Sequence, residues 1–267
     1  MRLFTLLAAI ASALTSTSVK ADETNQDGGD QMYEVRRYVL SDVKEFGAVS
    51  NYLTQALLPA LNKAGASPIG LMTNVNDDGS LADKTEEPTL LVIIPINDAG
   101  TLATLNSTVS KDPEYLESAA SYLATPGKSP LTRRIESELL VAMECMPKLS
   151  VPSGTVENLD RVYELRLYES ATENLGNLKV EMFNNGEVPI FLDCGIIPIF
   201  IGQAVVGGQT PSLTYLTVYP NDEARKEAWK QFRVHPDWKV LSKEPKYAGT
   251  VSKIDKYILR PLAGSQM

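Results

Sequence analysis

Tyr33-Glu34-Val35-Arg36-Arg37-Tyr38 returns 130 positions later as Tyr163-Glu164-Leu165-Arg166-Leu167-Tyr168. The same offset joins further residues, since Pro59, Gly65 and Pro68 match Pro189, Gly195 and Pro198. After a contraction of seven residues, Asp112-Pro113-Glu114-Tyr115 aligns with His235-Pro236-Asp237-Trp238. An offset that holds over so many residues indicates a duplicated domain, whereas a solenoid repeats every ~20–50 residues.

The two halves also share one order of secondary-structure signals. The first half predicts strands near 33–40, 69–73, 89–94 and 133–143, with helices over 43–64, 98–110 and 113–123. The second half predicts strands over 161–168, 197–206, 213–219 and 251–259, with helices over 172–191 and 222–232. The order βαββαβ is that of the ferredoxin-like unit.

A ferredoxin-like unit covers one face of its sheet with two helices and leaves the other face bare. Two units in one chain can bury their bare faces against each other. The predicted fold class is therefore α+β, with two tandem ferredoxin-like units forming an intramolecular α/β barrel. The chain would act as its own partner, and this pseudo-dimer could still form a further homo-oligomer.

The chain divides into five expected segments. Residues 1–21 have a basic residue, a short apolar stretch and a small residue at the end, which is typical of a cleaved signal peptide and predicts a secreted or periplasmic protein. A retained N-terminal anchor is the alternative. The remaining segments are a disordered tether at 22–30, a first repeat at 31–148, a linker at 149–160 and a second repeat at 161–263.

Charge narrows the range of partners. Removal of residues 1–21 leaves 23 basic and 33 acidic residues, a net charge of −10. Such a chain repels nucleic acid and anionic lipid, and it favours neutral or cationic partners. No later stretch has the length and apolar character of a transmembrane segment. The partner is therefore expected to be a small molecule or a protein.

Motifs for the common cofactors are missing. The single histidine, His235, excludes the usual zinc motifs, and Cys145 and Cys194 form no CxxC pair. We therefore expect no metal and assign no cofactor. The two cysteines lie at different places in the two repeats, which leaves open whether they pair.

Side chains alternate along the first strand of each repeat. We expect Tyr163, Leu165 and Leu167 to face the helices, and Glu164, Arg166 and Tyr168 to face the opposite sheet. The equivalent polar row in the first repeat is Glu34, Arg36 and Tyr38. These rows could be structural ion pairs, or they could form the wall of a pocket.

The second repeat resembles the NIPSNAP family. The resemblance extends over about a hundred residues and rests on these segments: Val162-Tyr163-Glu164-Leu165-Arg166-Leu167-Tyr168, Met182-Phe183, Gly186-Glu187-Val188-Pro189-Ile190-Phe191, Gly202-Gln203, Leu213-Thr214-Tyr215, Arg225, Trp229, Phe232 and His235-Pro236-Asp237-Trp238. It implies a ferredoxin-like fold of the dimeric α/β-barrel type, with no general catalytic mechanism. The first repeat looks like a diverged copy of this domain, since Tyr52-Leu53 stands where the second repeat has Met182-Phe183.

Function stays open at this stage, and we call the enzyme question undecided. The first hypothesis is a non-catalytic binding or interaction module. The second is a cofactor-independent barrel enzyme, oxygenase-like or isomerase-like, with Glu164 as proton acceptor and Arg166, Tyr168 and His235 as polar anchors. Other ligand-binding candidates are Glu34, Arg36, Tyr38, Gln203 and Tyr215. The third is haem binding through His235, although His235 and Asp112 could instead both cap the helix after the proline.

Overall fold

The computed structural model describes residues 31–82 and 87–267, so the expected signal peptide and tether at 1–30 lie outside the described residues. The strands in this part of the chain are β1 (Met32–Leu40), β2 (Gly70–Asn74), β3 (Thr89–Ile96), β4 (Thr132–Ala142), β5 (Val162–Glu169), β6 (Ile197–Val206), β7 (Ser212–Tyr219) and β8 (Lys253–Pro261). They form a closed antiparallel barrel in the order β1-β3-β2-β8-β5-β7-β6-β4. Each half thus supplies four neighbouring strands, and the halves join where β2 pairs with β8 and β4 with β6.

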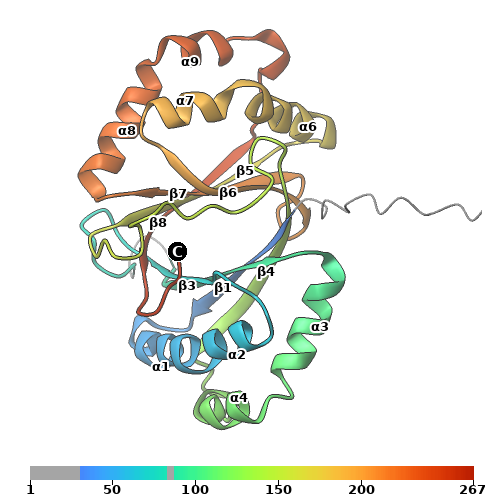
Figure 1. Cartoon of the computed structure of the whole chain (residues 1–267), viewed down its shortest axis with the longest axis vertical. Helices are drawn as coiled ribbons and strands as arrows, with labels where there is room; N and C mark the ends of the chain where they lie inside the picture. The colour runs from blue at the N-terminus through green and yellow to red at the C-terminus, as the bar shows by residue number, and fades with distance from the viewer. Residues whose placement is uncertain (1–30, 83–86) are drawn as a thin grey trace, which may run out of the picture.

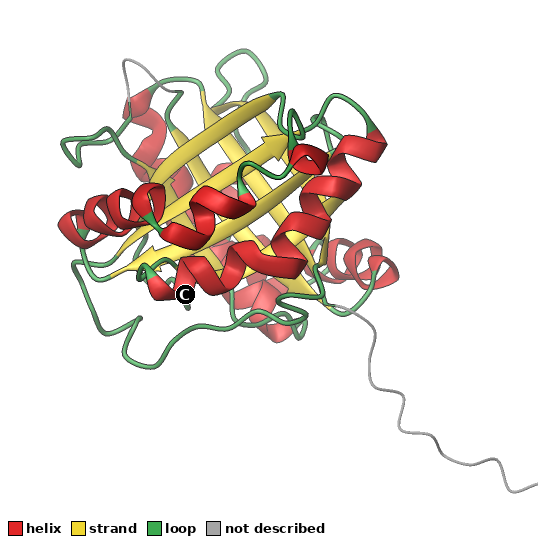
Figure 2. Cartoon of the chain, turned by 90° about the horizontal axis from the view of Figure 1, so that it is seen from above, coloured by secondary structure: helices red, strands yellow, loops and turns green. Residues whose placement is uncertain are grey.

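Helices lie outside the barrel in two layers (Figure 1). The layer of the first half contains α1 (Phe46–Tyr52), α2 (Leu58–Lys63), α3 (Ala99–Val109), α4 (Pro113–Ser118) and α5 (Ala120–Leu123). The layer of the second half contains α6 (Glu173–Met182), α7 (Val188–Asp193), α8 (Asp222–Val234) and α9 (Pro236–Leu241). Short 3₁₀ turns lie at η1 (Val43–Glu45) and η4 (Pro245–Tyr247). Figure 2 shows helices of one layer crossing over the strands.

Local features repeat at the offsets that the sequence predicts. A π-helical turn, η2 (Leu53–Leu57), joins α1 to α2, and a second one, η3 (Phe183–Glu187), joins α6 to α7 at an offset of 130. Asp98 caps α3 and Asn221 caps α8, each accepting a hydrogen bond from the main-chain N–H three residues later. The mixed α/β fold with an intramolecular barrel is confirmed.

The barrel interior is filled by side chains from both halves. Tyr33 and Val35 on β1 pack there with Tyr163 and Leu165 on β5, and the other members of this cluster include Leu91, Ile93, Leu140, Phe200, Leu216 and Leu259. The rings of Tyr33 and Phe200 lie 4.8 Å apart, which joins the two halves directly. Met267 is fully buried in the same cluster. The part of the barrel interior around this cluster is therefore filled by packed apolar side chains.

The prediction of which side chains on the first strands face the helices is wrong. Tyr163 and Leu165 point into the barrel instead of towards the helices, and Glu164 and Arg166 lie under α8. Both faces of β5 are buried, so alternation alone cannot tell the inner face from the outer one. The polar row can lie against the helices because α8 supplies an arginine and a tryptophan that match it.

Candidate functional site

The interior of the barrel changes from apolar to polar along its axis. Arg37 pairs with Leu91 and Glu136 across neighbouring strands, so it shares the inner face with them. Glu138 lies opposite Val35 in the same way. On the second half, Leu167 lies opposite Asp255 and Leu165 opposite Tyr257. Because these register positions continue the apolar interior, the charged side chains lie at one open end of the barrel.

This polar end is a cavity of about 480 Å³, which we call the mouth. A cavity of this size lies within the range of pockets that hold small organic molecules, about 300–1,000 Å³. Strands and loops of both halves build it, and its lining residues are Arg37, Glu87, Arg134, Glu136, Ser137, Glu138, Leu167, Gly208, Gln209, Lys253, Asp255 and Tyr257.

Glu138 is the most deeply buried acid of the mouth, with only 8% of its surface exposed. Its carboxyl accepts hydrogen bonds from the hydroxyls of Thr214 at 3.1 Å and Ser212 at 3.4 Å. Burial raises the pKa of Glu138 above its usual value, although the hydrogen bond from Thr214 and the charge of Arg37 act in the opposite direction. A carboxyl in this setting can exchange a proton with a bound molecule.

Polar contacts cross the mouth from one half to the other. Arg37 donates from Nη1 to the hydroxyl of Tyr257 at 3.2 Å, and its Nη2 lies 3.1 Å from the Glu136 carboxylate. Asp255 accepts from Gln209 at 2.7 Å and from Lys253 at 3.0 Å. Partial burial opposes ionisation of Asp255, but the bonds from Gln209 and Lys253 outweigh it and hold the pKa of Asp255 below its usual value. The mouth thus has a preorganised set of donors and acceptors.

The polar row of the second half forms a separate network between β5 and α8. The Glu164 carboxylate lies 2.6 Å from Arg166 Nε and 2.7 Å from Arg225 Nη1 on α8. The guanidinium of Arg166 stacks 3.5 Å above the Trp229 ring. The other members continue the chain of hydrogen bonds, from Arg166 to Tyr168 at 3.3 Å and between the hydroxyls of Tyr168 and Tyr215 at 2.8 Å. Four of the predicted site residues are therefore brought together, but outside the barrel.

The row of the first half forms a smaller version of this network. Arg36 donates to both carboxylate oxygens of Glu34 at 2.8 Å and to Asn106 at 3.0 Å. Glu34 also accepts from Ser137 at 2.7 Å. Tyr38 is buried, and burial raises the pKa of its hydroxyl. These residues have mutual partners, as expected of structural ion pairs.

A buried ion pair accompanies the network of the second half. Lys179 on α6 lies 2.6 Å from Glu187 in η3, and their side chains are 5% and 2% exposed. The ammonium group also lies 4.8 to 5.9 Å from the ring centroids of Phe183, Tyr168 and Trp238. Burial raises the pKa of Glu187, against the opposing charge of Lys179. The sequence reasoning did not single out this pair.

The two remaining candidates lie elsewhere. His235 accepts a hydrogen bond at Nδ1 from the main-chain N–H of Asp237, and Asp112 does the same for α4. The shared capping role that the repeat suggested is confirmed. Gln203 on β6 donates weakly to Asn177 at 3.4 Å and does not line the mouth. Cys145 and Cys194 are both free thiols.

Sequence reasoning missed the residues of the mouth, although a signal was present. Tyr33 and Val35 are followed by Arg37 on the same face of β1, and Leu140 is preceded by Glu138 on the same face of β4. An apolar face that becomes charged at one end is typical of a barrel interior that opens to solvent.

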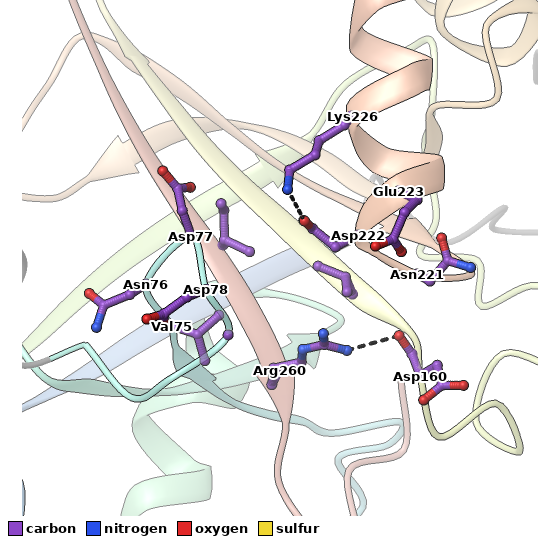
Figure 3. Close-up of a pocket in the computed structure, with 13 residues that line it drawn as sticks. Val75, Asn76, Asp77, Asp78, Asp160, Asn221, Asp222, Glu223, Lys226 and Arg260 are labelled. Atoms are coloured by element: carbon purple, nitrogen blue, oxygen red, sulfur yellow. Dashed lines mark hydrogen bonds and ion pairs between the residues drawn. The ribbon is translucent and has the colours of Figure 1, made fainter.

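A second cavity, of about 430 Å³, lies on the outside of the barrel between β2, β8 and the start of α8 (Figure 3). Val75, Val162 and Ile258 pack together at this place, and acidic side chains surround them. Asp222 is held by Lys226 at 2.6 Å, and Arg260 donates to the main-chain oxygen of Asp160 at 2.9 Å, as Figure 3 shows. The mouth is the stronger candidate because it contains a deeply buried acid.

Metal-binding clusters and membrane-spanning helices are both absent from the residues that the structure describes. Over residues 31–82 and 87–267, no group of three or more histidine, cysteine, aspartate or glutamate residues could hold a metal ion. Within the same ranges, no helix is long and apolar enough to cross a bilayer.

Solved structures with the same fold include a proposed monooxygenase from Fusobacterium nucleatum subsp. nucleatum, with 12% identity, a TM-score of 0.58, and coverage of 88% of this chain and 93% of that chain. A proposed monooxygenase from Lactobacillus acidophilus has 11% identity, a TM-score of 0.54, and coverage of 87% and 94%. The class is thus that of mixed α/β proteins with a closed eight-stranded antiparallel barrel.

The second half of the chain matches a known family. Residues 163–266 match the family model of NIPSNAP, so this part of the chain contains a NIPSNAP domain. A NIPSNAP-like domain protein from Burkholderia xenovorans has 18% identity and a TM-score of 0.36, and the match covers 40% of this chain and 90% of that chain. No curated protein matched the sequence.

Proposed function

We propose that this chain is a binding protein that holds a small organic molecule with polar groups in the mouth of its barrel. The observation that carries the proposal is the position of Glu138, a buried carboxyl that lines a cavity of about 480 Å³. Residues of both halves build this cavity. Pockets that combine a suitable volume with a few convergent polar groups are the usual place for small ligands.

The second candidate function is cofactor-independent catalysis on the molecule held there. It is favoured by the raised pKa of Glu138, because burial makes this carboxyl easier to protonate than an exposed one and so suits it to exchange a proton with a bound molecule. Two neighbours with this fold are proposed monooxygenases, but at 11% and 12% identity the likeness concerns the fold alone. Turnover therefore has to be tested on a ligand once it is known.

Haem binding through His235 stays a prediction, and the contacts of this residue do not favour it. Nδ1 of His235 accepts the hydrogen bond that caps α9, and Nε2 lies 3.9 Å from the Asp193 carboxylate. Replacing His235 with alanine should leave the Soret absorbance of protein mixed with haem unchanged if this residue is only a cap.

Two proposals concern the chain as a whole. The spatial order β4-β1-β3-β2 in the first half and β8-β5-β7-β6 in the second supports a pair of ferredoxin-like units made by duplication. The signal-like segment at 1–21 supports export from the cytoplasm, which cell fractionation would test.

Blocking the mouth tests the proposed function. A Cβ atom added at Gly208, which lines the mouth, would meet no atom within 4 Å, so Gly208→Trp can be introduced at this position without a clash at its Cβ. Gly127 is equally open but does not line the mouth, which makes Gly127→Trp the matched control.

Small molecules that copurify with each variant would be extracted and compared by mass spectrometry, alongside a thermal-shift screen of small metabolites with polar groups. We expect wild type and Gly127→Trp to retain the same compound and Gly208→Trp to lose it. Equal retention by all three proteins would refute binding in the mouth.

A further inference from the structure

The acids of the mouth differ in their partners. Glu136 is paired with Arg37 at 3.1 Å and with Arg134 at 3.2 Å. Asp255 is paired with Lys253 at 3.0 Å, and Glu87 with Arg133. For Glu138, the described part of the chain contains hydroxyl partners but no cation within ion-pair distance. The deepest acid of the mouth is thus the one without an ion pair among the described residues.

An unpaired carboxylate in a buried place is costly, and a cation that reaches it relieves that cost. Only 8% of the surface of Glu138 is exposed, and the residue lines the cavity. The charge of Arg37 reaches Glu138 through space, but Arg37 and Arg134 form their ion pairs with Glu136, and Lys253 forms its ion pair with Asp255. A positive group on a ligand can form such a pair with Glu138, and the net negative charge of the chain would attract it.

The opposite wall of the mouth suits the body of such a ligand. Tyr257 takes the register position on β8 that Glu138 takes on β4, since Tyr257 lies opposite Leu165 and Glu138 opposite Val35. Leu167, which is only 3% exposed, also lines the mouth. An aromatic ring and an isobutyl group offer apolar contact, and the ring also attracts cations.

We infer that the mouth takes a small organic cation, with a primary ammonium group against Glu138 and an apolar or aromatic body against Leu167 and Tyr257. The inference rests on the proposed function, and it adds the chemical class of the ligand. A neutral or anionic ligand would leave Glu138 without a counter-charge, and an anionic one would also face Glu136 and Asp255.

Binding of this ligand is coupled to a proton. The charged and titratable groups that line the mouth together with Glu138 are Arg37 on β1, Glu136 and Arg134 on β4, Lys253, Asp255 and Tyr257 on β8, and Glu87 before β3. Burial raises the pKa of the free Glu138 carboxyl, whereas an ammonium group stabilises its ionised form. At a pH near or below the pKa of Glu138, binding therefore releases a proton, and affinity falls as the pH drops through this pKa.

Three compounds with one skeleton test the inference, namely phenethylamine, 2-phenylethanol and phenylacetate. Their binding to the full chain would be measured by isothermal titration calorimetry, in two buffers of different ionisation enthalpy. Glu138→Gln keeps the shape and the hydroxyl contacts but removes the charge. Glu117→Gln, an exposed position on α4, is the matched control.

We expect wild type to bind phenethylamine most tightly and, at a pH near or below the pKa of Glu138, to release a proton on binding. Glu138→Gln should weaken phenethylamine at least about tenfold, because loss of one partner of a buried charge pair costs more than the ~1.4 kcal/mol of a tenfold change. Glu117→Gln should bind like wild type. Thermal unfolding of both variants would show that they are folded.

Other results would overturn the inference. Equal or tighter binding of 2-phenylethanol or phenylacetate would show that the mouth does not select a cation, while the proposed function would stand. Undiminished binding of phenethylamine to Glu138→Gln would remove Glu138 from recognition. Failure of wild type to bind phenethylamine at millimolar concentration would also overturn it, and the extraction experiment with Gly208→Trp would then judge the proposed function by itself.

Discussion

The buried pair of Lys179 and Glu187 gives the sharpest prediction about stability. The first repeat has Val49 and Leu57 at the equivalent positions, 130 residues earlier, and both are buried. The same helix and the same π-helical turn therefore form without any ion pair. We predict that the pair is not required by the fold, although breaking it is costly.

The magnitude follows from burial. The two side chains are 5% and 2% exposed and lie 2.6 Å apart. Removing one of them therefore leaves the other as a buried charge with neither its counter-ion nor water around it. Lys179→Met should lower the free energy of unfolding by about 3–5 kcal/mol. Glu187→Leu should cost about 0.5–2 kcal/mol less than that, because the aromatic rings around Lys179 still attract its charge.

The double variant shows whether the fold requires the ion pair. Lys179→Met with Glu187→Leu fills the same space with apolar side chains, and it should be as stable as wild type or more stable by up to about 4 kcal/mol. Urea unfolding followed by tryptophan fluorescence would measure this, since Trp238 lies 5.9 Å from the ammonium group and reports on the second half. Lys243→Met, at an exposed position, should change stability by less than about 0.5 kcal/mol. A double variant as unstable as Lys179→Met would refute the reasoning.

Three further predictions concern single side chains. His235→Asp should keep the stability of wild type, because Asp112 caps the equivalent helix, whereas His235→Ala should lose about 1 kcal/mol in urea unfolding. The pKa of Glu138 is raised on folding, so the folded protein binds the extra proton and its stability falls as the pH rises from the unfolded to the folded pKa. Urea unfolding across this pH range should show that Glu138→Gln lacks the decline, and a parallel curve for both proteins would contradict the shift. Burial raises the pKa of Cys145 to about 11, so iodoacetamide at neutral pH should label it slowly in the folded protein and readily in urea, as peptide mapping would show.

The repeat predicts the fold because it relates residues that lie far apart in the sequence. Tyr33 and Tyr163 mark the same place in two units, and the offset carries the whole element order with it. The inner face of the barrel could not be predicted in this way. Both faces of β5 are buried, and the alternation of Tyr163 with Glu164 is equally compatible with either direction. Arg225 and Trp229, one turn apart on α8, were the signal that the polar row lies under a helix.

The mouth could not be predicted from local patterns for a different reason. Glu138 meets Thr214 only because β4 pairs with β6 and so brings the two halves of the chain together. Neither residue lies near the other in sequence, and no motif joins them. The register across the closing strands decides which polar side chains converge, and that register is a property of the closed barrel.

The sequence differences between the two repeats explain why the two walls of the mouth differ. Equivalent register positions hold Arg37 and Leu167, and likewise Glu138 and Tyr257. Two identical units would give a mouth with twofold symmetry, in which every ligand group meets the same side chain twice. Here one wall carries the buried acid and the other carries the aromatic ring, so an asymmetric ligand binds in one orientation. The tandem arrangement makes this asymmetry available to a single chain, because each copy of the unit can change without changing the other.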